Sequence, residues 1–234
     1  EHNIRKGVKN MSTFRFAIMG AGNIAHQFCD AVTLVEDCEV SAIASKDLGR
    51  AQKFAEECSV AHAYDNYEQM LIEEKPDCVY IAVTPNDHFR LTMLCLEHRV
   101  PVLCEKAMFT NSAEAKAVFE KAEKDQTFVM EAMWSRFLPA VNQAKKWAAE
   151  GKIGRLEALQ GRIGFLAPEG ADNRYHSPLL CGGAATDITV YAYEIATWLV
   201  NEPVRKTYAA ANLDQTGVDL TDQVTVKFEH VLAD

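Results

Sequence analysis

Short runs of β-branched and other apolar residues alternate with helical patterns between Phe14 and Met133. This alternation is typical of parallel strands joined by crossover helices. In the segments between the runs, apolar residues recur at helical spacing, so each helix can lay one face on a sheet. Asn111, with Glu114 three residues on, predicts the start of one such helix. The pattern predicts an α/β domain with a doubly wound parallel sheet, whose strands are expected at Phe14–Met19, Glu39–Ala44, Val60–Ala63, Cys78–Val83, Pro101–Cys104 and Thr127–Glu131.

The pattern changes after Met133 and predicts an α+β domain with an open, mostly antiparallel sheet. Long strands beside one strongly apolar helix leave a sheet edge without a partner, so we expect this domain to be incomplete at its C-terminus. The domains are therefore predicted as a tag or loose leader at 1–12, a first domain at 13–133 and a partial second domain at 134–234. The second domain is expected to contain a helix at Leu138–Glu150, a strand at Arg155–Phe165, a helix at Gly183–Val200, and strands at Val204–Asn212 and Gln223–Val231.

Composition and charge exclude several classes of protein. The 24 Lys and Arg residues against 33 Asp and Glu give a net charge of −9, without a basic cluster, which argues against binding to nucleic acid or anionic lipid. No apolar run approaches the roughly 20 residues that span a membrane. The 7 cysteines form no C-x-x-C pair, which argues against a disulfide framework or a zinc site and favours a reducing, cytoplasmic location. Nothing indicates a metal.

A glycine-rich turn joins the first predicted strand to the first helix. It reads Gly20-Ala21-Gly22-Asn23-Ile24-Ala25, a G-x-G-x-x-A pattern. One glycine permits the tight turn, the second lets a pyrophosphate approach, and the helix N-terminus attracts the phosphates. We therefore expect a Rossmann dinucleotide site that includes Gly20, Gly22, Asn23 and Ile24, with a purely structural glycine turn as the alternative.

The end of the second strand indicates which dinucleotide binds. An NAD site would carry a carboxylate there for the ribose 2′-hydroxyl, whereas this strand ends in Ser45-Lys46. Lys46 and Arg50 lie four residues apart, where both could meet a 2′-phosphate. An ordinary solvated pair is the alternative, since Asp47 lies nearby. NADP is favoured over NAD.

Two further segments follow predicted strands, where ligands bind in open α/β sheets. Thr84-Pro85-Asn86-Asp87-His88 follows the fourth strand, and Glu105-Lys106 follows the fifth. A lysine there could hold a cofactor ribose and favour the phenolate form of a nearby tyrosine. The alternatives are a surface charge for Lys106 and a helix-start residue for His88.

An acid and a phenol stand together near the start of the apolar second-domain helix. Asp187 and Tyr191 lie four residues apart, after Gly182-Gly183. Such groups are costly to bury in an apolar segment without purpose. The alternative is a surface hydroxyl on Tyr191 and a helix-start Asp187 favoured by the helix dipole.

Taken together, these motifs resemble those of the Gfo/Idh/MocA oxidoreductases, in which a Rossmann domain precedes an open-sheet substrate domain. The likeness runs from Phe14 to the end of the chain. The segments Cys104-Glu105-Lys106-Ala107-Met108 and Glu131-Ala132-Met133-Trp134-Ser135-Arg136-Phe137-Leu138-Pro139 are most similar to its branch of trans-dihydrodiol dehydrogenases and NADP-dependent xylose dehydrogenases. The family usually reads Glu-Lys-Pro, often with a cis peptide before the proline, whereas Ala107 stands here.

The resemblance implies that Lys106 and Tyr191 form a catalytic pair. Tyr191 would take the hydroxyl proton as hydride leaves the substrate for the nicotinamide, Lys106 would stabilise the phenolate, and Asp187 would orient the substrate. Trp134 and Arg136 would line the substrate side. Many relatives carry histidine in place of Tyr191, so the phenol points to the dihydrodiol branch. A homodimer through the second-domain sheet is also implied.

Three functions follow as hypotheses. The first is a cytoplasmic NADP-dependent oxidoreductase that acts on a cyclic polyol, either a sugar or a trans-dihydrodiol. The second is a non-catalytic NADP(H)-binding sensor or partner protein with the same fold. The third is an NAD enzyme, which would keep its cofactor preference after loss of Lys46 and Arg50.

Overall fold

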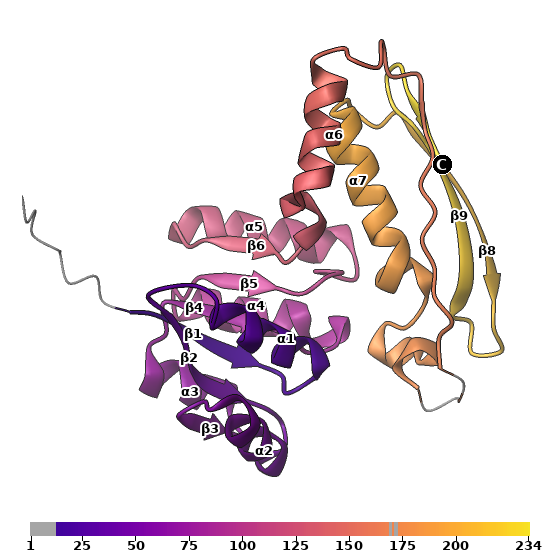
Figure 1. Ribbon diagram of the computed structural model, residues 1–234. Coiled ribbons are helices and arrows are strands. Elements are labelled where there is room, and N and C mark those ends of the chain that lie inside the picture. The colour runs from indigo at the N-terminus through magenta and orange to yellow at the C-terminus, as the bar shows by residue number, and fades with distance from the viewer. Residues whose placement is uncertain (1–12, 169, 171–172) are drawn as a thin grey trace, which may run out of the picture. The chain divides into compact units, whose positions relative to one another are not determined.

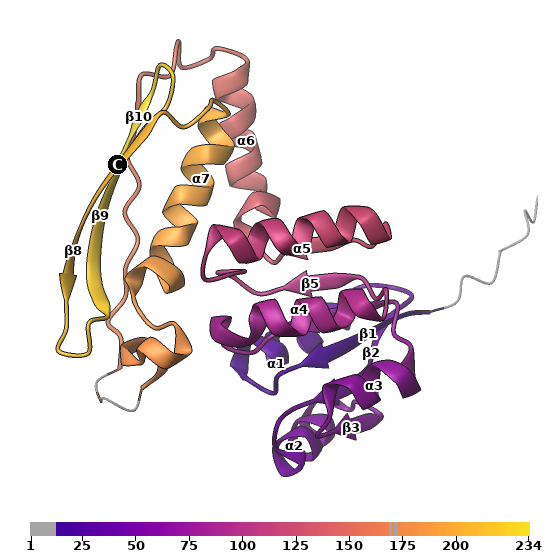
Figure 2. The ribbon, with the colours of Figure 1, turned by 180° about the vertical axis from the view of Figure 1, so that it is seen from behind.

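The computed structural model describes residues 13–168, 170 and 173–234. Within them the chain divides into two compact units (Figures 1 and 2). The first contains the residues up to Val83 together with Asp87–Glu105 and Ala115–Met130, and the second contains Thr84–Asn86, Lys106–Glu114 and Glu131–Asp234. Short segments of the first predicted domain thus group with the second unit. The predicted leader at 1–12 lies outside the described residues.

A six-stranded sheet forms the centre of the first unit, in the order β3-β2-β1-β4-β5-β6. β1 pairs in parallel with β2 on one side and with β4 on the other. The chain adds strands outward from β1 to β3 on one side and then from β4 to β6 on the other. The predicted doubly wound sheet is confirmed, with its switch point at β1 and β4, where open sheets bind ligands. Its strands are β1 Phe14–Met19, β2 Cys38–Ala44, β3 His62–Tyr64, β4 Cys78–Ile81, β5 Val102–Cys104 and β6 Val129–Glu131.

Helices cover both faces of this sheet, and α1 contacts α2 on one of them (Figures 1 and 2). Side-chain caps define several of their starts. Asp47 accepts a hydrogen bond from the backbone N–H of Arg50, and Asn111 accepts one from the N–H of Glu114. The predicted cap at Asn111 is confirmed. The helices are α1 Asn23–Val32, α2 Leu48–Cys58, α3 Tyr67–Glu74, α4 His88–Glu97 and α5 Ser112–Asp125.

The second unit holds a four-stranded sheet in the order β7-β10-β9-β8. β10 is parallel to β7 and antiparallel to β9, and β9 is antiparallel to β8. The mostly antiparallel sheet is therefore confirmed. Its strands are β7 Ala158–Leu159, β8 Lys206–Leu213, β9 Asp219–Lys227 and β10 Leu232–Ala233, and its main helices are α6 Pro139–Ala149 and α7 Val190–Val200.

Three predicted bounds in this unit were wrong. Among the described residues, the expected strand Arg155–Phe165 forms a ladder at β7, where β10 lies beside it, and further backbone bonds join Glu157 and Gly161 to residues 232 and 234. The expected strand Gln223–Val231 runs over the turn that joins β9 to β10, closed by a bond from Phe228 N–H to Val231 O. That turn lacks glycine and proline, so the sequence did not mark it. The expected helix from Gly183 begins as a π-helical turn, Ala185–Thr189, which leads into α7.

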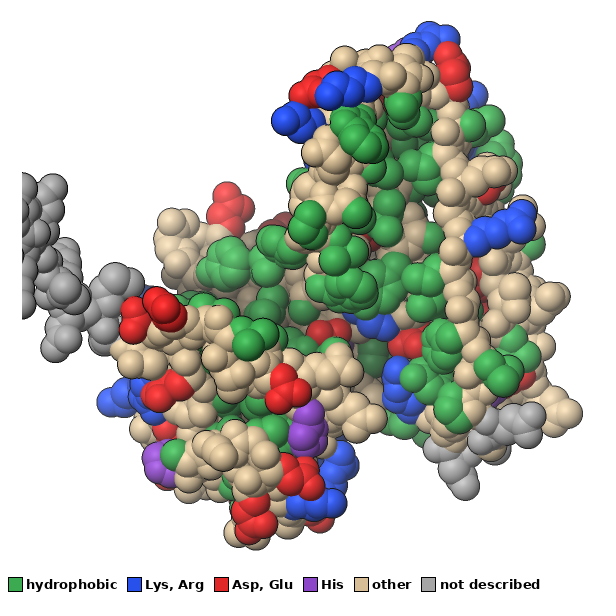
Figure 3. Space-filling model, in the orientation of Figure 1, with side chains coloured by type: hydrophobic (Ala, Val, Ile, Leu, Met, Phe, Trp, Pro, Cys, Tyr) green, Lys and Arg blue, Asp and Glu red, His purple; other side chains and the backbone are tan. Residues whose placement is uncertain are grey.

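The core of the second unit lies where α7 packs on the sheet. Ala196 of α7 joins Val226, Phe228, Val231 and Ala233, all nearly inaccessible to solvent. Hydrophobic side chains also gather over α6 and α7 on the face seen in Figure 3. Among the described residues, no helix is both long and apolar enough to cross a membrane.

Candidate active site

The glycine-rich turn packs tightly against the end of β4. Gly20 has φ +109°, and a Cβ at this position would lie 2.7 Å from the carbonyl oxygen of Ala82. Its backbone N–H bonds to Ala44 O at 2.8 Å, which joins the turn to β2. Gly20 is thus required by the backbone conformation and by the close approach of two strands.

Gly22 meets a different requirement. A Cβ there would meet only Ala82 O, at 3.9 Å, and Gly22 is the N-cap of α1 without any side-chain cap. The N–H groups of Asn23 and Ile24 have no hydrogen-bond partner in the described part of the chain. An uncapped helix N-terminus with open space before it fits a dinucleotide pyrophosphate.

Two basic side chains follow β2: Lys46 lies just after the strand, and Arg50 lies in the first turn of α2. Arg50 donates to the carbonyl oxygen of Ala21 in the glycine-rich turn at 3.3 Å, which places its guanidinium beside the turn. Lys46 is ion-paired with Asp87, which also accepts from Arg90 at 3.2 Å. Burial raises the pKa of Asp87, but hydrogen bonds from Lys46 and Arg90 outweigh it and hold that pKa below its ordinary value. Ser45 is buried.

His88 is completely buried at the first residue of α4, and its Nε2 lies 3.1 Å from Val83 O. This placement favours the helix-start interpretation over a ligand contact. Thr84 is half-buried and Asn86 is exposed. Glu105 accepts a hydrogen bond from the hydroxyl of Tyr80 at 2.5 Å.

Lys106 and Asp187 form the centre of a polar cluster in the second unit. Lys106 Nζ lies 3.0 Å from Asp187 Oδ1 and 2.6 Å from the Asp187 backbone oxygen. Both side chains are largely buried, with 15% and 13% exposed. Arg174 Nη2 lies 3.1 Å from the same Oδ1, so one carboxylate holds two cations. The peptide bond between Lys106 and Ala107 is cis.

Tyr191 lies against this cluster. Lys106 Nζ is 5.2 Å from the centroid of its ring. The indole Nε1 of Trp134 donates to the Tyr191 hydroxyl oxygen at 2.9 Å. The phenol oxygen thus accepts a hydrogen bond, and the Lys106 ammonium lies over the ring. A hydrogen-bond donor on the oxygen and a cation close to the ring both favour the charged form of a phenol.

A buried acid fixes the segment that carries Trp134. Glu194, on α7 one turn after Tyr191, accepts from Ser135 Oγ at 2.6 Å and pairs with Arg136. The Arg136 guanidinium also stacks over the ring of Trp198, 4.7 Å from its centroid. This geometry gives Arg136 a structural role, and its predicted contact with substrate stays a prediction.

The structure brings Lys106, Asp187, Tyr191 and Trp134 together, although Asp187 and Lys106 are 81 residues apart in the chain. Sequence reasoning missed Arg174, which lies in a loop without periodicity. It also missed Glu194, although a lone carboxylate inside an apolar helix is a detectable signal. In the described residues, no three His, Cys, Asp or Glu side chains gather to hold a metal ion.

Sequence comparison gives two family models that together cover most of the chain. "Oxidoreductase family, NAD-binding Rossmann fold" matches residues 14–133, and "GFO/IDH/MocA C-terminal domain" matches residues 141–234. Trans-1,2-dihydrobenzene-1,2-diol dehydrogenase of Mus musculus is 31% identical over 92% of this chain. The Danio rerio protein of the same name is 31% identical over 94%. The chain spans 65% and 66% of the lengths of these two relatives.

Solved structures show the same fold at lower identity. A 3-ketoreductase from Actinomadura kijaniata in complex with TDP-benzene and NADP aligns with a TM-score of 0.87 at 23% identity, over 95% of this chain and 69% of that one. A scyllo-inositol dehydrogenase from Lactobacillus casei, with NAD(H) and scyllo-inositol bound, aligns with a TM-score of 0.78 at 14% identity, over the same shares. With both of its domains matched by the family's models, this chain belongs to the Gfo/Idh/MocA oxidoreductases.

Proposed function

We propose that the chain binds NADP and catalyses oxidation of a hydroxyl group on a cyclic polyol, a sugar or a trans-dihydrodiol, or the reverse reduction of the carbonyl. The observation that carries this proposal is the cluster of Tyr191 with Lys106, Asp187 and Trp134. A phenol that receives a hydrogen bond at 2.9 Å and has an ammonium beside it is suited to exchange a proton with a substrate hydroxyl.

Tyr191 is assigned as the general base of the oxidation. Its phenolate oxygen accepts the proton of the substrate hydroxyl, and in the reduction its hydroxyl returns that proton to the carbonyl oxygen. The Trp134 N–H stabilises the phenolate by a hydrogen bond, and the Lys106 ammonium stabilises it electrostatically. When bound, the nicotinamide supplies the other half of the reaction by accepting or donating hydride.

Asp187 is assigned to position the groups around Tyr191. Its carboxylate fixes the Lys106 ammonium at 3.0 Å and also holds Arg174 at 3.1 Å. Both cations are thereby oriented around one carboxylate, the Lys106 ammonium in a largely buried position and the Arg174 guanidinium in a partly exposed one. A substrate hydroxyl could also bond to a second lone pair of this carboxylate, in line with its predicted contact with substrate.

In the first unit, the N–H groups at the start of α1 are suited to the pyrophosphate, and Arg50 and Lys46 to a ribose 2′-phosphate. Arg50 supports NADP over NAD because its guanidinium lies beside the glycine-rich turn and no acid ends β2. Thr84, Asn86, Glu105 and Lys106 are retained as predicted cofactor contacts. A cyclic diol substrate is supported by the names of the Mus musculus and Danio rerio relatives.

Assembly and location also belong to this proposal. All eight residues of β8 are exposed, which supports a homodimer formed through the second-domain sheet. Substitution of Tyr208, half-exposed on β8, by Asp would then shift the mass measured by light scattering from dimer to monomer. The seven cysteines are all free thiols, which supports a reducing, cytoplasmic location.

Tyr191→Phe tests the catalytic assignment. We expect turnover of trans-1,2-dihydrobenzene-1,2-diol or of a sugar or inositol panel to fall by about 10²–10⁴-fold, the usual contribution of a positioned acid–base group. The dissociation constant for NADPH should change less than about twofold, because the phenol hydroxyl is assigned to the substrate.

Tyr193→Phe is the matched control, since Tyr193 lies two residues on in the same helix and is 45% exposed. It should keep full activity. Equal activity in Tyr191→Phe and the wild type would remove Tyr191 from the mechanism. NADPH binding without turnover of any compound in the panel would favour the non-catalytic NADP(H)-binding protein.

A further inference from the structure

The π-helical turn Ala185–Thr189 carries Asp187 at its centre. Turns of this kind are rare in proteins and are frequent at functional sites. Lys106 Nζ donates to the backbone oxygen of Asp187 at 2.6 Å and lies 3.0 Å from its Oδ1. The backbone of the turn, as well as the Asp187 side chain, therefore sets the position of the ammonium group.

Asp219, the first residue of β9, caps the beginning of this turn from a distant part of the chain. Its Oδ2 accepts a hydrogen bond from the Ala185 N–H at 2.6 Å. A negative charge at the N-terminus of a helical segment is also electrostatically favourable. The carboxylate lies so close to Gly183 that a Cβ there would overlap Asp219 Oδ1. The second glycine of the Gly182-Gly183 pair thus leaves room for this cap.

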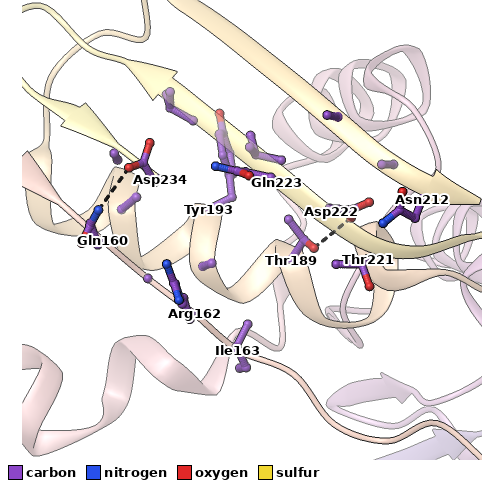
Figure 4. A pocket seen from close by; sticks show the side chains of 18 residues that line it. Gln160, Arg162, Ile163, Thr189, Tyr193, Asn212, Thr221, Asp222, Gln223 and Asp234 are labelled. Atoms are coloured by element: carbon purple, nitrogen blue, oxygen red, sulfur yellow. Dashed lines mark hydrogen bonds between the residues drawn. The ribbon is translucent and has the colours of Figure 1, made fainter.

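Asp222, three residues further along β9, holds the end of the turn. Its Oδ2 accepts from Thr189 Oγ1 at 3.0 Å, the bond drawn in Figure 4. Burial, and to a smaller extent the neighbouring carboxyl group of Asp219, raise the pKa of Asp222 above its ordinary value. The two carboxyl groups therefore lie close together along the turn, one at each end.

A β-bulge in β9 directs both side chains to this turn. The pairing of β9 with β8 shifts register between Asp219 and Thr221, so Leu220 is an extra residue. Alternate residues of a regular strand share a face, and positions 219 and 222 would then point to opposite faces. The extra residue turns Asp219 to the face of Asp222, while Leu220 is 50% exposed. Bulges commonly re-aim side chains next to active sites.

Given the proposed roles of Lys106 and Tyr191, on which this inference rests, we propose that Asp219 and Asp222 are positioning residues for the reaction. From β9 they hold the two ends of the π-helical turn. They thereby fix the two Asp187 oxygens that orient the Lys106 ammonium over the Tyr191 ring, 5.2 Å from its centroid. A displacement of about 1 Å in such an arrangement can cost about 10²-fold in rate.

Alanine and asparagine variants of the two aspartates test this role. Alanine removes the hydrogen-bond acceptor, whereas asparagine keeps one. With the diol or the sugar and inositol panel, kcat of Asp219→Ala and of Asp222→Ala should fall about 10–100-fold. KM and the dissociation constant for NADPH should change less than about twofold. Asp219→Asn and Asp222→Asn should recover most of the activity.

Thr221→Ala is the matched control, because Thr221 lies between the two aspartates on the same strand and is exposed. It should keep full activity.

A second measurement needs no substrate. The ultraviolet absorbance of phenolate is titrated with pH, and the difference between each protein and its Tyr191→Phe counterpart follows the Tyr191 phenol alone. When the turn loosens, the Lys106 ammonium is no longer held over the ring, and the phenolate is less favoured. The midpoint should therefore move to higher pH in Asp219→Ala and Asp222→Ala and return in the asparagine variants. If the wild type turns over no compound in the panel, the proposed function fails, whereas this titration still decides the positioning role.

The bond at the end of the turn can also be removed from its other partner. Thr189→Val lacks the hydroxyl that Asp222 binds, whereas Thr189→Ser keeps it, and this pair decides the case if the alanine variants do not fold. Circular dichroism verifies the fold of each variant. An unchanged kcat and Tyr191 titration in the folded alanine variants or in Thr189→Val would overturn the proposal. Asparagine variants as impaired as the alanine variants, or an equal loss in Thr221→Ala, would also overturn it.

Discussion

Arg50 is expected to provide most of the preference for NADP over NAD. Its guanidinium lies at the glycine-rich turn, where its Nη2 makes a 3.3 Å bond to a carbonyl oxygen. A hydrogen bond between arginine and a phosphate is worth about 1.5–3 kcal/mol, and the lower end applies because Arg50 is exposed. Arg50→Ala should therefore weaken NADPH binding by about 1.5 kcal/mol, or roughly tenfold.

Lys46 should contribute less, although it carries the same charge. Its ammonium is already paired with Asp87, so a 2′-phosphate must share or displace that carboxylate. Exposed ion pairs contribute about 0–1 kcal/mol, and we expect Lys46→Ala to weaken NADPH binding by about 0.7 kcal/mol, or threefold.

Isothermal titration calorimetry with NADPH and with NADH measures both effects. NADH lacks the 2′-phosphate, so its affinity should be unchanged in both variants. Lys53→Ala is the matched control, because Lys53 lies on the same helix with 76% of its side chain exposed and loses the same charge. Equal losses of NADPH and NADH affinity in Arg50→Ala, or a loss in Lys53→Ala as large as that in Arg50→Ala, would refute the assignment.

Three further predictions concern stability. Gly20→Ala should lower the free energy of unfolding in urea by about 2–4 kcal/mol, because the new Cβ would lie 2.7 Å from Ala82 O in a backbone with φ +109°. Gly217→Ala is the control: its φ is +84° but no atom lies within 4 Å of the new Cβ, so it should cost about 1 kcal/mol. Glu194→Gln should lower the free energy of unfolding by about 1–3 kcal/mol in the same assay, because it removes the negative charge that binds the Ser135 hydroxyl and the Arg136 guanidinium. An unchanged urea midpoint would contradict this. Hydrogen bonds, chiefly from a threonine hydroxyl, lower the pKa of Asp214 from 3.8 to about 2, so its contribution to stability is complete above pH 3.8 and is lost as the pH falls towards 2. Asp214→Asn should flatten the acid limb of the stability profile in that range, and an identical limb would show that Asp214 does not contribute.

The sequence alone determined the architecture of the first unit. The alternation of strand and helix patterns is local, and so is the glycine-rich turn, so both could be predicted without knowledge of distant contacts. The same holds for the cap at Asn111, where the donor and acceptor lie three residues apart. The ends of the strands were predicted only to within a few residues. Burial and packing, more than the propensity of single residues, set where the last pair of a strand lies.

Only the tertiary structure decided how the second unit is organised. The extended segment around β7 has a strand pattern over its whole length, yet pairing requires a neighbour, and in the part of the chain that the structure describes the neighbour β10 forms its ladder at Ala158–Leu159. The partners of Asp187 were equally hidden, because Arg174 comes from an irregular loop and Lys106 from a distant part of the chain. Residue types and their local spacing identified the candidate acid, base and cation. Which of them meet depends on contacts between residues far apart in sequence, and those form only when the chain folds.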